Sequence, residues 1–164
     1  MSHWGLTYKT FEVLWPEEWN KVVDALDELW NSLTVGLYFV VPVCKVGLGF
    51  NYNEYKSVLP YSGDIDAGYG YPLPLKSVAV GLMVKVQSNT LDGKSYVIAR
   101  KNGTETDLRV EIGSGSTGIF VIDGIEVPFN QGDEIDFAVD TRNLTTGSIT
   151  IGSISAVLRV VVSS

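Results

Sequence analysis

The sequence predicts a mainly β protein: an antiparallel β-sandwich of jelly-roll type, preceded by one short amphipathic N-terminal helix. Two observations favour this fold class. Residues 35–164 contain about eight short apolar stretches separated by turn signals roughly every 8 to 12 residues, as in sandwiches. Helical periodicity is strong only in residues 15–33. We therefore expect residues 1–34 to form an arm and helix for assembly or packing, and residues 35–164 to form the jelly-roll domain.

The predicted helix begins with a proline and two acidic residues. Pro16 suits the first helical position, and Glu17 and Glu18 place negative charge where the helix dipole favours it. Apolar residues then recur in steps of three and four, which predicts one apolar face made by Trp19, Val22, Val23, Leu26, Leu29, Trp30 and Leu33. This face is our candidate oligomer interface, because it is too apolar to lie in water alone. Alternatively, the helix covers the open face of its own β domain.

The clearest strand pattern lies in residues 76–87, which alternate between two faces. Val80, Leu82 and Val84 are expected to point into the core, and Lys85 toward solvent or a partner. In the same way, Ile135, Phe137 and Val139 should be buried in the core. Asp136, Arg109 and Glu111 should face solvent or a partner.

Tight turns are expected between several strands. Asn102-Gly103 is the strongest short hairpin signal in the chain. Asp123-Gly124 predicts a second tight hairpin, between residues 119–122 and 125–129. The last strand should run from about residue 148 to 162, with a bend at Gly152-Ser153.

A connection rich in tyrosine, glycine and proline spans residues 44–75. Tyrosine combines apolar area with a hydrogen-bonding tip, which suits adaptable surface recognition. The candidate surface-recognition residues are Tyr52, Tyr55, Tyr61, Tyr69 and Tyr71. The alternative is a structured crossover whose tyrosines cover the edge of the sandwich.

The sequence motifs that could indicate catalysis or cofactor binding lack the neighbouring elements and partner residues that such sites need. Residues 113–118 match G-x-G-x-x-G, but a strand pattern follows them, whereas a dinucleotide site needs a helix N-terminus there. The single histidine, His3, and the single cysteine, Cys44, offer no nucleophile–base pair and no disulfide. The acidic loops match no EF-hand spacing. We expect no catalytic residue, no cofactor, no metal ligand, and a protein that is not an enzyme.

The charge balance is acidic. Twelve basic and 19 acidic residues give a formal net charge of -7, which disfavours binding to nucleic acid. The first residues lack the basic and apolar segments of a signal peptide. The most apolar stretch, residues 35–43, is too short to span a bilayer. The sequence thus predicts neither a signal peptide nor a membrane span.

Several segments carry a resemblance to known proteins: residues 76–93, 99–106, 113–118, 131–133 and 147–155. This pattern resembles jelly-roll virion proteins of prokaryotic (archaeal or bacterial) viruses, of tail-fibre or capsid-surface type. Residues 6–12 and 17–29 are similar to the N-terminal segment of fibre-like viral proteins.

The resemblance implies a non-enzymatic virion structural protein: a fibre or spike head, a capsid decoration protein or a coat subunit. It implies assembly in the host cytoplasm as a homo-oligomer, most often a trimer, with other virion proteins as partners. One alternative is a carbohydrate- or cell-surface-binding module whose tyrosines contact a host surface glycan. Another is an extracellular filament subunit that assembles by strand addition.

Overall fold

The computed structural model describes residues 20–26, 37–43, 45–66 and 70–161. The chain divides into two units, Met1–Gly36 and Leu37–Ser164, and each is described by itself. In the first unit, residues 20–26 are helical. The rest of the predicted helix, residues 15–19 and 27–33, lies outside the described residues.

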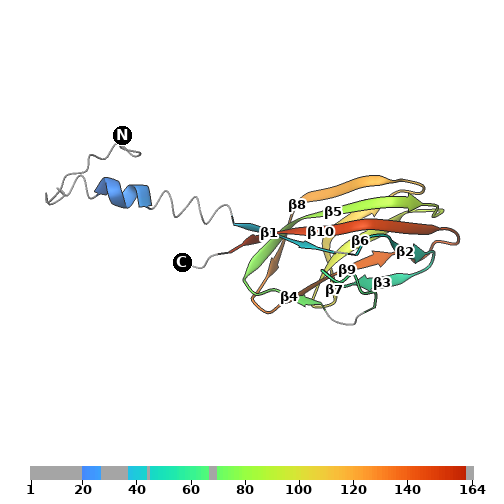
Figure 1. The fold of residues 1–164 in the computed structure, drawn as a ribbon, viewed down its shortest axis with the longest axis horizontal. Helices are drawn as coiled ribbons and strands as arrows, with labels where there is room; N and C mark the ends of the chain where they lie inside the picture. Colours follow the sequence, from blue (N-terminus) through green and yellow to red (C-terminus); the bar gives the residue numbers. More distant parts are fainter. Residues whose placement is uncertain (1–19, 27–36, 44, 67–69, 162–164) are drawn as a thin grey trace. The chain divides into compact units, whose positions relative to one another are not determined.

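The second unit contains two five-stranded antiparallel sheets (Figure 1). Sheet A has the order β1-β10-β5-β8, with β2 also paired to β10; its strands are β1 (Tyr38–Pro42), β2 (Leu48–Asn51), β5 (Ser77–Asn89), β8 (Gly118–Phe129) and β10 (Ser148–Val160). Sheet B has the order β3-β9-β6-β7, with β4 also paired to β9; its strands are β3 (Tyr55–Val58), β4 (Tyr71–Pro72), β6 (Ser95–Lys101), β7 (Thr104–Ile112) and β9 (Glu134–Asp140). The prediction of a mainly β, antiparallel fold is confirmed.

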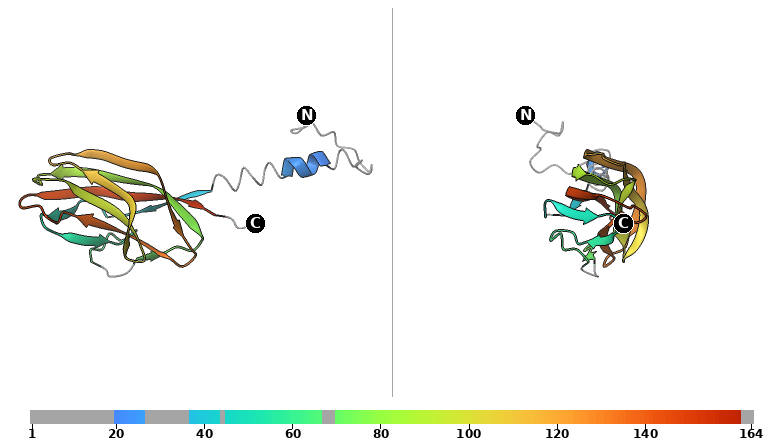
Figure 2. Two further views of the ribbon diagram at one scale, coloured as in Figure 1. Left: turned by 180° about the vertical axis from the view of Figure 1, so that it is seen from behind. Right: turned by 90° about the vertical axis from the view of Figure 1, so that its right-hand side faces the viewer.

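One hydrophobic core joins the two sheets. Figure 2 shows the two sheets from behind and from one side. It forms because alternate residues of each strand point to the same side of a sheet. Leu82 and Val84 enter it from sheet A, and Phe137 and Val139 enter it from sheet B; each of these side chains is at most 1% exposed. Their burial was predicted, as was that of Ile135.

The prediction of a tight hairpin at Asp123-Gly124 is wrong. Both residues lie inside β8, which pairs with β5 on either side of them. The register moves from Ala79↔Val127 to Gly81↔Asp123, so the dipeptide forms a bulge in a continuous strand. Gly124 has a φ of 74°, a conformation that serves a bulge as well as a hairpin turn.

The same irregularity corrects the prediction for Val80. The alternation of β5 changes phase between Ala79 and Gly81, so Ala79 is fully buried in the core and Val80 is half-buried outside it. Other local predictions are confirmed. Asn102 and Gly103, both with positive φ, connect β6 to β7, and the register of β10 shifts on either side of Ile151, next to the predicted bend.

Candidate functional site

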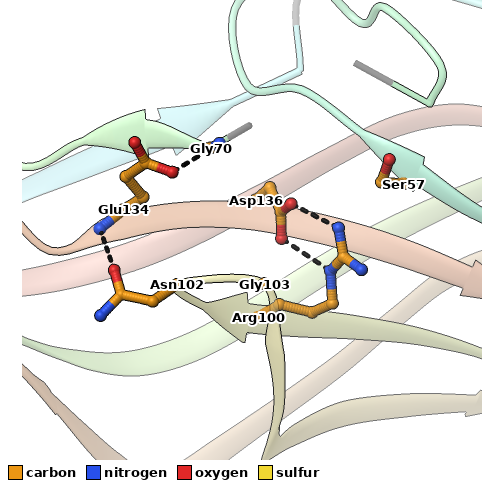
Figure 3. Close-up of a pocket in the computed structure, with 7 residues that line it drawn as sticks. All are labelled: Ser57, Gly70, Arg100, Asn102, Gly103, Glu134 and Asp136. Carbon is orange, nitrogen blue, oxygen red and sulfur yellow. Dashed lines mark hydrogen bonds and ion pairs between the residues drawn. The ribbon is translucent and has the colours of Figure 1, made fainter. Parts of the chain in front are cut away.

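A pocket of about 280 Å³ lies on the outer face of sheet B (Figure 3). Strands β3, β6 and β9, the β6–β7 turn and the residue before β4 contribute its lining, which consists of Ser57, Gly70, Arg100, Asn102, Gly103, Glu134 and Asp136. The polar side chains of Ser57, Arg100, Glu134 and Asp136 gather here because each points away from the core on its strand, and Asn102 joins them from the β6–β7 turn.

A buried ion pair forms one wall of this pocket. Arg100 and Asp136 are cross-strand neighbours on β6 and β9. Arg100 Nε donates to Asp136 Oδ1 at 2.8 Å, and Nη2 donates to Oδ2 at 2.5 Å. Their side chains are only 13% and 4% exposed. The hydrogen bond to Asp136 raises the pKa of Arg100 above its ordinary value, although burial opposes this shift. The prediction that Asp136 faces solvent or a partner is wrong, because its side chain is buried against Arg100 of the same chain.

Backbone groups hold the opposite wall. The Gly70 N–H donates to Glu134 Oε2 at 2.9 Å, and the Glu134 N–H donates to Asn102 Oδ1 at 2.7 Å. A Cβ on Gly70 would lie 2.8 Å from the Cβ of Glu134, so a side chain at this position would force the two segments apart. Three segments that are distant in sequence therefore meet at this wall.

A network of charged and aromatic side chains continues from the pocket across the outer face of sheet B. The guanidinium carbon of Arg142 lies 4.2 Å from the centre of the Tyr55 ring, and that of Arg100 lies 5.9 Å from it. Arg142 also pairs with Asp140 at 2.8 Å and with Glu105 at 3.4 Å. Burial is the main cause that raises the pKa of Tyr55. Tyr55 is thus a member of this network.

The predicted recognition tyrosines occupy separate places. Tyr61 and Tyr71 form a tilted ring pair with centroids 4.6 Å apart, and both rings are partly exposed. Tyr52 is exposed in the turn between β2 and β3. Tyr55 lies in the network described above, and Tyr69 lies outside the described residues. The structure brings two of the five together, and their role in recognition stays a prediction.

Three of the seven predicted interface residues of the helix are described. Val22 is half-buried, whereas Val23 and Leu26 are exposed. The remaining four, Trp19, Leu29, Trp30 and Leu33, lie outside the described residues. Their role as an oligomer interface stays a prediction.

Sequence reasoning missed an apolar surface on the outer side of sheet A. Five large side chains on this side are each at least 40% exposed: Tyr38, Val40, Met83, Ile119 and Val121. We call these five residues the apolar face. They alternate with inward neighbours such as Phe39 and Phe120, which pack against the core. The available signal was the run of consecutive apolar residues from 119 to 122, because a strand with such a run is apolar on both sides.

No group of three or more potential metal ligands among His, Cys, Asp and Glu occurs in the described part of the chain. Within the same ranges, no helix has the length and hydropathy needed to cross a membrane. No protein-family model and no curated protein matches the chain.

Proposed function

We propose that this protein is a non-enzymatic structural protein that acts by assembly into a homo-oligomer, as a virion component of the fibre-head, decoration or coat type. The observation that carries this proposal is the apolar face. Large apolar side chains that stand exposed together on one side of a sheet are typical of surfaces that contact another protein. The exposed Val23 and Leu26 of the helix add apolar surface in the first unit.

The strand orders support a jelly roll as the fold of the subunit. Numbering β2, β3 and β5 to β10 as eight consecutive strands gives sheet orders of 1-8-3-6 and 2-7-4-5. This is the order produced by two interlocked Greek keys, in which the chain passes repeatedly between the sheets. Viral capsid domains and lectins share this architecture. The fold alone therefore does not choose between assembly and ligand binding, and the apolar face favours assembly.

The engagement of the pocket carboxylates supports a function without catalysis. Both oxygens of Asp136 accept hydrogen bonds from Arg100, and Glu134 accepts one from the Gly70 backbone. A general acid or base needs a carboxyl oxygen that can reach a substrate proton, and Asp136 has both of its oxygens committed. We propose that the protein needs no cofactor and contacts other virion proteins.

The mass of the full-length protein in solution tests this proposal. Multi-angle light scattering at tens of micromolar should give a multiple of the chain mass, with a trimer as the expected state. A stable monomer across this concentration range would contradict the proposal. Electron microscopy of native particles from the source then tests the virion context, because the chain should be traceable in an ordered lattice.

A second candidate function is recognition of a cell-surface saccharide. The pocket on sheet B and the partly exposed Tyr61–Tyr71 pair favour it, since sugars are bound by polar side chains and aromatic surfaces. Calorimetric titration with neutral and acidic oligosaccharides tests it. Saturable binding by a protein that remains monomeric would favour recognition over assembly.

A further inference from the structure

Three dipeptides of the chain are open to the same spontaneous backbone reaction. An aspartate or asparagine is followed by glycine at Asp92-Gly93, Asn102-Gly103 and Asp123-Gly124. In such a pair the glycine nitrogen can attack the side-chain carbonyl carbon of the preceding residue, because glycine has no side chain that shields its amide. A five-membered succinimide ring forms, and its hydrolysis leaves isoaspartate in the main chain. The fold decides which of the three dipeptides can react.

Hydrogen bonds restrain Asn102. Its backbone N–H donates to the Glu134 carbonyl oxygen at 2.9 Å, and its Oδ1 accepts from the Glu134 N–H at 2.7 Å. Its Nδ2 donates to Asp133 Oδ1 at 2.9 Å. Ring closure expels Nδ2 as ammonia and turns the plane of the side chain, so both side-chain hydrogen bonds must break first. The reaction at Asn102 therefore requires local opening of the fold.

Asp92 is restrained in a comparable way. The Thr145 hydroxyl donates to Asp92 Oδ2, and the Thr145 backbone N–H donates to Oδ1 at 3.2 Å and to Oδ2 at 3.3 Å. The hydroxyl is the main cause that lowers the pKa of Asp92, so the protonated carboxyl, which releases water most readily, is rarer. Gly93 is also crowded, because a Cβ there would lie 2.6 Å from Leu144 Cδ2.

Asp123 has neither restraint. Its side chain is exposed and makes no hydrogen bond or ion pair within the part of the chain that the structure describes. Gly124 has a φ of 74°, and no atom beyond its chain neighbours lies within 4 Å of the place that a Cβ would take. The bulge leaves Gly124 outside the register, which passes from Asp123↔Gly81 to Val127↔Ala79. The Asp123 side chain can thus approach the Gly124 nitrogen without losing a contact.

We propose that Asp123 is a site of spontaneous isomerisation to isoaspartate that the fold leaves open, whereas Asp92 and Asn102 are protected. The Gly124 nitrogen bonds to the Asp123 side-chain carbonyl carbon, and the carboxyl hydroxyl leaves with the amide hydrogen as one water molecule. Water then opens the ring. Cleavage at the side-chain carbonyl restores aspartate, and cleavage at the main-chain carbonyl gives isoaspartate. The mass is unchanged and water is the only co-reactant. This inference goes beyond the proposed function and does not depend on it.

Isoaspartate would alter the part of β8 that follows the bulge. The main chain then runs through the former side chain and gains one methylene, while a carboxylate remains on the α-carbon. Residues 127–129 pair with residues 77–79 of β5, and Phe129 is buried in the core. A longer chain before Val127 should loosen this pairing. Hydrogen exchange at Val127 and Phe129 should accordingly be faster in the isomerised protein.

Incubation of dilute full-length protein for weeks at neutral pH, native and in urea, tests the proposal. Trypsin cleaves after lysine and arginine, which places the three dipeptides in separate peptides, residues 86–94, 102–109 and 110–142. Enzymatic methylation that is specific for isoaspartate, with fragmentation mass spectrometry, measures conversion at each site. Asp123 should react in the native protein at nearly its rate in urea. Asp92 and Asn102 should react at least about tenfold more slowly in the native protein than in urea.

Two variants test the physical cause. Asp123→Glu should abolish isoaspartate at this position, because the longer side chain cannot close a five-membered ring. Thr145→Val removes the hydroxyl that holds Asp92, so native conversion at Asp92 should rise several-fold. Thr146→Val is the matched control, since Thr146 is also exposed and its hydroxyl makes no hydrogen bond among the described residues. It should leave conversion at Asp92 unchanged.

The comparison of native and unfolded rates decides the outcome. Native conversion at Asp123 that is slowed as much as conversion at Asp92 would overturn the proposal, because the two share the same dipeptide. Unprotected conversion at Asn102 in the native protein would also overturn it, since its hydrogen bonds would then give no protection.

Discussion

Replacing Asp136 with asparagine should destabilise the β unit strongly, because it leaves the Arg100 guanidinium buried without its counterion. The side chain of Arg100 is 13% exposed, that of Asp136 is 4% exposed, and the two share two short hydrogen bonds. Removing one member of such a pair typically costs about 3–5 kcal/mol. Arg100 retains some solvent contact and lies 5.9 Å from the Tyr55 ring centre, so we expect a loss near 3 kcal/mol.

The assay is urea unfolding at neutral pH, followed by far-ultraviolet circular dichroism. Circular dichroism is the probe because it reports on the strands themselves, whereas all four tryptophans, Trp4, Trp15, Trp19 and Trp30, precede the β unit in the sequence. Replacing both partners by apolar residues, Arg100→Met with Asp136→Leu, should cost far less than Asp136→Asn alone, since no charge is left unpaired.

A matched control exists on the same strand. Asp140 pairs with Arg142; the Asp140 side chain is 16% exposed, but that of Arg142 is 50% exposed and keeps its water when its partner is removed. Asp140→Asn therefore leaves no buried unpaired cation and should cost about 1 kcal/mol, less than Asp136→Asn. The reasoning is refuted if Asp136→Asn costs no more than Asp140→Asn, or if the double replacement is as damaging as the single one.

Three further predictions follow from burial, charge and the helix. Val84→Asp should abolish cooperative unfolding, because Val84 is fully buried and the free-energy cost of an unpaired charge there exceeds the free energy of unfolding of one domain. A soluble variant that unfolds cooperatively would contradict this. Hydrogen bonding from Asn102, aided by Lys101, lowers the pKa of Asp133 to about 2, below the ordinary 3.8. The ionised carboxylate therefore stabilises the fold above pH 3.8, and this contribution is lost as the pH falls through 2. Asn102→Ala should raise that pKa in an NMR titration of the carboxyl carbon, and an unchanged value would disprove the cause. Deleting residues 1–34 should lower the association constant measured by light scattering, because Trp19 alone is expected to contribute roughly 1.5–3 kcal/mol if it is buried; unchanged association would exclude the helix from the interface.

Local patterns predicted much of the core and one hairpin. The alternation around Leu82 and Val84 specifies which side is buried, and Asn102-Gly103 specifies its turn through backbone conformation alone. Asp123-Gly124 satisfies the same local rule and still forms a bulge. The difference lies in β5, which has 13 residues and pairs with both halves of β8. That pairing depends on a distant segment, which a local pattern does not contain.

The two candidate sites differ in how far the sequence could predict them, because they rely on distant contacts to different degrees. Asp136 could be assigned to the outer side of a strand, but its pairing with Arg100 depends on the register between β6 and β9. The apolar face was within reach of the sequence, because residues 119–122 are apolar on both sides of their strand. A continuous apolar run usually indicates a strand that is buried on both sides, and here one of those sides is exposed in the single chain.

The most direct test of assembly through sheet A is cryo-electron microscopy of the full-length protein at a resolution that shows side chains. We expect ordered homo-oligomers in which a second copy lies against the apolar face around Val40, Met83 and Val121. Single copies with the outer side of sheet A bare, or oligomers joined through sheet B, would contradict this expectation.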